Sequence, residues 1–353
     1  MQAQSLAFLK QLLSTPGPSG DEMAVAQVWR EEARTFADTV SADVRGNSYA
    51  RLEGTGPRVL LAGHIDEIGL MISYIDEQGY LFFAPIGGWD AQVLVGQRVR
   101  LQGQQGPVIG VIGKKPIHLI EADERSRASK IEQLWIDIGV KNRDEVLAQG
   151  VQVGCTGVID VPLYEFPHSR IVSRSLDNRI GAFTVLEALR LLAQRRPFAT
   201  VVTVATTQEE TSLTGATTAA FACDPHIAIV VDVIFATDHP ESDLRQYGDV
   251  KLGGGPVLSR GAANSPLVYE RLLAIAAQEQ IPYSLQISPR HTGTDADAIH
   301  KVRSGVATGV ISIPTRYMHS PNEMIDLADV AHAARLIAAF VRSIHSEKEF
   351  VPT

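Results

Sequence analysis

The sequence predicts an α/β protein in which a mixed sheet lies between two layers of helices and a smaller β-rich segment interrupts the domain. Residues 1–73 and 165–353 combine helical periodicity with Val/Ile-rich runs such as ATVVTVATTQEE and IAIVVDVIFA, which suit strands buried on both faces. Residues 74–164 contain short strand-like pieces broken by glycine, such as GYLFFAPIGG and VQVGCTGVIDVPL. Because the α/β pattern resumes afterwards, we expect an insertion into one domain.

Three segments follow from this pattern. Residues 1–73 form the first part of the α/β domain, residues 74–164 the inserted domain, and residues 165–353 the second part. The helices DNRIGAFTVLEALRLLAQ and DLADVAHAARLIAAFVRSI are expected to cover the sheet. In the second helix, apolar residues recur at steps of three and four and form one stripe: Leu327, Val330, Ala334, Ile337, Val341 and Ile344. The alternative is a single irregular sheet protein.

Composition and charge exclude several classes of protein. The 353 residues carry a net charge of -8, which argues against a nucleic-acid binder because such a protein needs a basic face. An apolar run of about 18 residues, which a membrane-spanning helix requires, is absent from the sequence. The two cysteines, Cys155 and Cys223, are far apart and predict no disulfide framework. We therefore expect a cytoplasmic protein with neither nucleic acid nor membrane as a partner.

Ionisable residues collect where the predicted strands end. They are His64 and Asp66 after VLLAG, Glu209 and Glu210 after VVTVATTQ, Asp232 after IAIVV and His319 after GVISIPTRYM, whereas Asp177 precedes a helix. Open α/β sheets build their sites at this edge, and buried charges there are costly unless they are paired or bind metal. Each residue alone could be a structural histidine or a turn or helix cap. Together they predict a centre for zinc, cobalt or manganese.

The balance of charge favours two metal ions over one. Two divalent cations outweigh three carboxylate ligands by one unit of charge, so a hydroxide can be held with the cluster near neutral. A single cation with the same ligands would be over-neutralised and would act as a poor Lewis acid.

Five ordered motifs, HIDEIG, SLDNRIG, TQEE, VVDV and YMHSPNE, resemble the tetrahedral aminopeptidases, dinuclear metallopeptidases that include glutamyl and deblocking aminopeptidases and "cellulase M" relatives. The similarity covers nearly the whole chain. It implies a metal-dependent aminopeptidase that removes N-terminal residues from peptides. It also implies that the β-rich segment is a PDZ-like oligomerisation domain and that subunits form a hollow homo-oligomer, a dodecamer built from dimers.

The resemblance assigns roles residue by residue. Asp177 would bridge the two metal ions, and its peptide bond to Asn178 would be cis. His64 and Asp232 would complete one metal site, and Glu210 and His319 the other. Asp66 matches a carboxylate that orients the His64 imidazole, and Glu209 matches the general base. Glu67 has no assigned role.

Three alternatives to the aminopeptidase fit the sequence to different degrees. The same dinuclear centre suits an N-acyl amino acid deacylase or related amidohydrolase. A non-enzymatic assembly scaffold that retains a metal site is disfavoured by the intact Glu209, which a structural site would not need. A glycosidase is disfavoured, because that chemistry uses two carboxylates and no metal.

The TQEE motif carries a further expectation about local structure. Neighbouring side chains in a strand point to opposite faces. Glu209 and Glu210 can therefore reach one site only if the strand ends before them and the chain turns.

Overall fold

The computed structural model describes residues 2–121 and 127–352. Within these residues the largest sheet has eight strands in the order β1-β2-β12-β3-β13-β16-β14-β15. Their bounds are β1 Thr39–Ala42, β2 Ser48–Leu52, β3 Arg58–His64, β12 Thr200–Thr206, β13 Ile227–Phe235, β14 Val257–Gly261, β15 Ser284–Ser288 and β16 Ala307–Thr315. The central strands β12, β3, β13 and β16 are parallel, so their carboxyl ends meet at one edge of the sheet.

Helices cover both faces of this sheet, because alternate strand residues point to opposite sides. In β13, Ile229 and Val231 belong to one hydrophobic cluster, and Ala228 and Val230 belong to another. The first cluster includes helices α1 (Ala3–Ser14), α2 (Met23–Ala33), α5 (Leu176–Gln194), α9 (Pro266–Gln278) and α11 (Leu327–Arg342), and the second includes α7 (Thr214–Cys223) and α10 (Ala296–Ile299). Across residues 2–121 and 127–352, the structure contains no helix whose length and hydropathy would let it cross a membrane.

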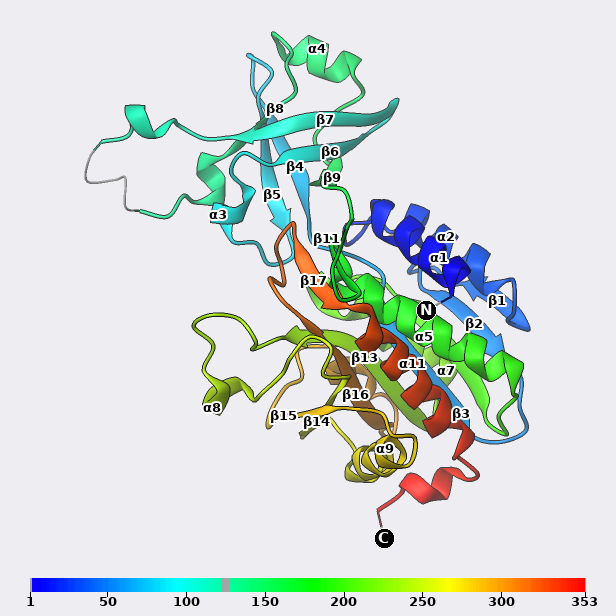
Figure 1. Ribbon diagram of the computed structural model, residues 1–353. Coiled ribbons are helices and arrows are strands. Elements are labelled where there is room, and N and C mark those ends of the chain that lie inside the picture. Colours follow the sequence, from blue (N-terminus) through cyan, green and yellow to red (C-terminus); the bar gives the residue numbers. More distant parts are fainter. Residues whose placement is uncertain (1, 122–126, 353) are drawn as a thin grey trace.

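The segment between β3 and the second part of the sheet forms a closed barrel in the order β4-β5-β8-β7-β6-β9. Its elements are β4 Gly69–Ile75, β5 Leu81–Ile86, α3 Ala91–Leu94, β6 Arg98–Gly103, β7 Gly106–Gly113, β8 Trp135–Asp137, α4 Arg143–Ala148 and β9 Thr156–Ile159. The barrel has its own apolar core and stands apart from the α/β domain in Figure 1. The predicted fold class, a mixed-sheet α/β/α domain with an inserted β-rich domain, is confirmed.

The barrel strands lie between Gly69 and Ile159, so the first of them starts before residue 74, where the change of sequence pattern placed the boundary. The change in sequence pattern comes a few residues after the barrel begins, because the segment LMISYI is as apolar as the preceding strand. The boundaries at 74 and 164 stay predictions. A small sheet of β10 (Tyr164–Phe166), β11 (Arg170–Ser173) and β17 (Glu323–Asp326) forms where the chain returns to the α/β domain.

Helix α5 lies unusually close to the sheet, and two glycines permit this approach. A Cβ atom on Gly63 of β3 would lie 2.5 Å from the carbonyl carbon of Gly181, and one on Gly181 would lie 2.5 Å from the Val231 carbonyl oxygen. Such distances leave no room for a side chain. The peptide bond between Asp177 and Asn178 is cis, as expected. The start of α5 lies beside β3 and β13, where Asp177 is close to His64 and the Asn178 side chain donates a hydrogen bond to the Val231 carbonyl oxygen.

Candidate metal centre

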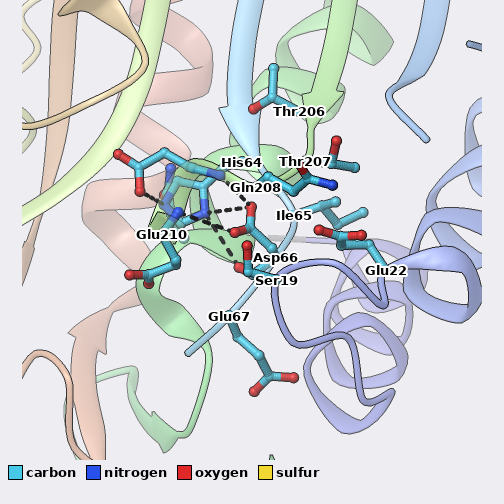
Figure 2. A network of polar contacts seen from close by, with 12 residues as sticks. Ser19, Glu22, His64, Ile65, Asp66, Glu67, Thr206, Thr207, Gln208 and Glu210 are labelled. Atoms are coloured by element: carbon cyan, nitrogen blue, oxygen red, sulfur yellow. Dashed lines mark hydrogen bonds and ion pairs between the residues drawn. The ribbon is translucent and has the colours of Figure 1, made fainter. Parts of the chain in front are cut away.

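His64 is the last residue of β3, and Asp66 lies just beyond it (Figure 2). Both side chains are buried, and Asp66 Oδ1 lies 3.4 Å from His64 Nδ1. The opposite nitrogen, Nε2, faces the other acidic residues of the site. A carboxylate beside Nδ1 favours the tautomer whose Nε2 is free to bind a metal ion.

Asp66 also fixes the segment that carries the two adjacent glutamates. Its two carboxylate oxygens accept hydrogen bonds from the backbone N–H groups of Glu209 and Glu210, each at 3.2 Å. Strand β12 ends at Thr206, Gln208 adopts a left-handed conformation with φ 58°, and the short helix α6 (Glu209–Ser212) follows. The expected end of the strand and turn of the chain are therefore confirmed, and both glutamates reach one site.

Asp177 lies between the two histidines. Its Oδ1 is 3.3 Å from His64 Nε2, and its Oδ2 is 3.3 Å from His319 Nε2. The two oxygens of one carboxylate thus face two different imidazoles. A carboxylate in this position could bind one cation through each oxygen.

The remaining acidic residues divide between the same two imidazoles. Glu209 Oε2 lies 3.6 Å from His64 Nε2, and Asp232 Oδ1 lies 3.8 Å from that atom. Glu210 Oε2 lies 3.6 Å from His319 Nε2. The structure therefore brings together all seven residues singled out from the sequence, from β3 and the loop after it, α5, α6, β13 and the loop after β16: His64, Asp66, Asp177, Glu209, Glu210, Asp232 and His319.

Two overlapping groups within this set have the spacing of metal ligands. One comprises His64, Asp177 and Glu210, and the other His64, Glu209 and Asp232, with the donor atoms of each group within 4.8 Å of one another. His319 lies outside both groups, although it is close to Asp177 and Glu210. Glu209 is near enough to His64 to compete as a ligand, so distances alone do not separate its role from that of Glu210.

The electrostatics of the site show an excess of buried negative charge. Burial raises the pKa of Glu209 to about 9 and raises the pKa values of Glu210 and Asp232 well above their usual range. Burial also opposes ionisation of Asp177, but hydrogen bonds from His319 and His64 lower the pKa of this carboxyl. Without cations, protons must therefore neutralise part of the cluster.

The residues present fit divalent metal ions. Glu210 Oε1 is buried and has no hydrogen-bond partner among the described residues, so it is free to bind a cation. Imidazole nitrogens and carboxylate oxygens together are the donors that zinc, cobalt and manganese accept. Positive charge here would replace the protons that burial otherwise favours.

A family model described as M42 glutamyl aminopeptidase matches residues 46–336. The chain belongs to this family. It is 34% identical to the lysyl aminopeptidase of Pyrococcus furiosus over 350 residues, which cover 98% of this chain and 99% of the relative. The resemblance inferred from the five motifs is confirmed.

Solved structures agree with the family assignment. The TET aminopeptidase of the marine sediment archaeon Thaumarchaeota archaeon SCGC AB-539-E09 is 36% identical with a TM-score of 0.94, and the match covers 98% of both chains. The Pyrococcus horikoshii TET1 peptidase, described as assembling into a tetrahedron or a large octahedral shell, is 29% identical with a TM-score of 0.86, and the match covers 96% of this chain and 100% of that one. This M42 family member is an aminopeptidase and hydrolyses peptide bonds.

Sequence reasoning missed a buried acid that contacts two of the candidate ligands. The Glu323 carboxylate accepts hydrogen bonds from the backbone N–H of Asp177 at 2.9 Å and of His319 at 3.0 Å. It therefore joins the start of α5 to the loop after β16. Glu323 is the last residue of the YMHSPNE motif, so the residue itself could be noticed in the sequence. Its contact with Asp177 joins residues 146 positions apart and could not be predicted from a local pattern.

Glu67, which the sequence left without a role, is a structural residue of the same edge. Figure 2 shows its side chain pointing away from His64 and Glu210. The carboxylate forms buried ion pairs with Arg174 and, at 2.6 Å, with Arg179, and accepts a hydrogen bond from the Gly17 N–H. Arg179 also donates to the Leu12 carbonyl oxygen. Glu67 thus ties the loop after β3 to the N-terminal segment and to α5.

We predict that Glu67→Gln lowers the free energy of unfolding by about 3 to 5 kcal/mol, because it leaves two guanidinium groups buried without their carboxylate. Chemical denaturation of the metal-free protein measures this change. Glu53→Gln is the matched control, since the Glu53–Arg51 ion pair is exposed at 55% and 44% and should contribute no more than about 1 kcal/mol. Equal stabilities of the Glu67→Gln and Glu53→Gln variants would contradict the structural role of Glu67.

Proposed function

We propose that this aminopeptidase binds two divalent metal ions per subunit and that Asp177 bridges them. The observation that carries the proposal is the position of the Asp177 carboxylate, whose two oxygens face His64 and His319 separately at 3.3 Å. His64 and Asp232 would complete one metal site, and Glu210 and His319 the other. Zinc, cobalt and manganese are the cations that this donor set suits.

The metal ions would supply Lewis acidity, which polarises the scissile carbonyl and makes a water molecule more acidic. Glu209 would act as the general base. Its carboxylate reaches the His64 side of the cluster, and its backbone is held by the hydrogen bond that the Glu209 N–H donates to the Asp66 carboxylate. In this role Glu209 takes one proton from the attacking water as the C–O bond forms, and gives it to the leaving amine nitrogen as the C–N bond breaks.

Asp66 would act through its neighbours and would not contact the substrate. It lies beside His64 Nδ1 and accepts the N–H groups of both glutamates. One carboxylate therefore orients an imidazole ligand, a carboxylate ligand and the proposed base. Asp66 fixes their relative positions before a substrate binds.

Hydrolysis of a short peptide with a free N-terminus, compared with its N-acetylated form, tests the substrate class. We expect metal-free protein reloaded with zinc, cobalt or manganese to release the first residue of the free peptide and to leave the acetylated peptide intact. Release of acetate or another acyl group alone would instead favour an N-acyl amino acid deacylase. Hydrolysis of neither compound by metal-loaded protein would favour an assembly scaffold.

The adjacent glutamates should respond differently to the same substitution. Glu209→Gln keeps the size of the side chain but removes the proton acceptor, so turnover should fall by roughly 10² to 10⁴ while two metal ions stay bound. Glu210→Gln should bind one metal ion much more weakly. Metal content and turnover are measured on both variants. If Glu209→Gln loses metal and Glu210→Gln keeps it, the two roles are reversed.

We further propose that residues 74–164 act as an oligomerisation domain and that the subunits form a dodecamer built from dimers. The barrel exposes large apolar side chains, including Tyr74, Ile109 and Val111, and a related peptidase is described as assembling into a tetrahedron or an octahedral shell. Light scattering should show large homo-oligomers. An active monomer at all concentrations would contradict this role of the barrel.

We place the enzyme in the cytoplasm, where a reducing environment suits its cysteines. Cys155 and Cys223 are both free, and one of them is buried. Fractionation of the native cells tests this location, and recovery of the enzyme outside the cytoplasmic fraction would contradict it.

A further inference from the structure

The turn Gly87–Gly88, between β5 and α3 of the barrel, lies against two of the proposed metal ligands. A Cβ atom placed on Gly87 would lie 3.2 Å from Glu210 Oε2 and 2.5 Å from Ile68 Cγ2. A Cβ atom on Gly88 would lie 3.3 Å from His319 Nδ1 and 3.5 Å from its Cε1. A side chain at either position would therefore press on a proposed ligand, and the two glycines let the backbone of the inserted barrel pack closely against the candidate metal centre.

The turn is held in place from the barrel side. Strand β5 ends at Ile86, which pairs with Gly69 at the start of β4. The Trp89 indole N–H donates a hydrogen bond to the Gly69 carbonyl oxygen at 2.9 Å. Asp90 then caps α3 by accepting the backbone N–H of Gln92. Since Gly87 adopts a φ of +73°, the turn has a defined conformation that favours glycine.

The two histidines of the centre have different supports. His64 is 2% exposed and lies beside the Asp66 carboxylate, within the α/β domain. The His319 side chain is 36% exposed, and its ring lies against Gly88 of the barrel, where a Cβ atom would be 3.3 Å from Nδ1. His319 Nε2 faces Asp177 and Glu210, so Nδ1 is the ring nitrogen that lies toward the turn. The orientation of a histidine that binds metal through Nε2 is commonly fixed by the groups around its other ring nitrogen, and here those groups include the backbone of the turn.

We propose that the Gly87–Gly88 turn is a positioning element of the metal centre, through which the barrel orients His319 and Glu210. The proposal rests on the proposed dinuclear site. It assigns the barrel a function within each subunit in addition to any function in assembly. The turn contacts the ligands of only one of the two metal sites, so its effect should be confined to the site formed by Glu210 and His319.

Isothermal titration calorimetry of metal-free protein with zinc tests this assignment without relying on activity. The wild-type protein should bind two ions. Gly87→Ala should weaken the binding of one ion by about 10- to 100-fold, as loss of an interaction that orients a ligand typically does, and leave the other unchanged. Gly88→Ala, which has no conflict with Ile68 and meets only the His319 ring, should weaken the same ion.

Gly96→Ala is the matched control. Gly96 lies in the same barrel with a φ of +79°, close to the +73° of Gly87, but a Cβ atom there would have no atom within 4 Å. Both alanines therefore introduce a similar backbone strain, and thermal unfolding of the metal-free proteins shows whether each barrel is folded. Gly96→Ala should bind both ions as the wild type does.

The outcomes separate this inference from the proposed function. If wild-type protein binds two ions and both Gly87→Ala and Gly88→Ala bind them with wild-type affinity, the turn has no positioning role. Equal weakening by Gly96→Ala would also overturn the inference, because the effect would then come from the barrel as a whole. If wild-type protein itself binds fewer than two ions, the dinuclear proposal fails, and the role of the turn fails with it.

Discussion

Negative charge buried at the carboxyl edge of the parallel strands is the constraint on which the rest of this structure depends. Asp177, Glu209, Glu210 and Asp232 lie around two imidazoles. Burial opposes the ionisation of all four carboxyls and raises the pKa of every one except Asp177, where hydrogen bonds from the two histidines outweigh it. Such a cluster is costly to maintain unless protons or cations neutralise it. The surrounding residues act to hold these groups in place despite their mutual repulsion.

Three buried carboxylates outside the proposed ligand set hold the surrounding segments in position. Asp66 accepts the backbone N–H groups of Glu209 and Glu210, Glu323 accepts those of Asp177 and His319, and Glu67 pairs with Arg174 and Arg179. Each joins segments that are distant in the sequence. Close packing of α5 on β3, which Gly63 and Gly181 permit, brings the start of the helix to the same edge. The geometry of the centre therefore depends on hydrogen bonds to backbone N–H groups and on close backbone packing as well as on contacts between side chains.

The sequence predicted the candidate ligands because each of them follows a recognisable local pattern. His64 ends a Val/Ile-rich strand, and the TQEE motif required a turn that the structure contains. Asp232 differs from the prediction, because β13 does not end at the run IAIVV but continues through Asp232 to Phe235. The supporting contacts could not be predicted in this way, since they join segments with no shared pattern. Glu67 and Arg174 are 107 residues apart, and nothing local marks Gly87 as a neighbour of Glu210. The first barrel strand was also hidden, because its apolar residues continue those of β3.

The central claim is that the carboxylate of Asp177 is shared by two metal ions. Anomalous diffraction from crystals of the zinc-loaded enzyme, recorded on both sides of the zinc absorption edge, tests it most directly. The account predicts two peaks on either side of the Asp177 side chain, one next to His64 and the other next to His319. A single peak in fully loaded crystals, or peaks that do not contact Asp177, would contradict it.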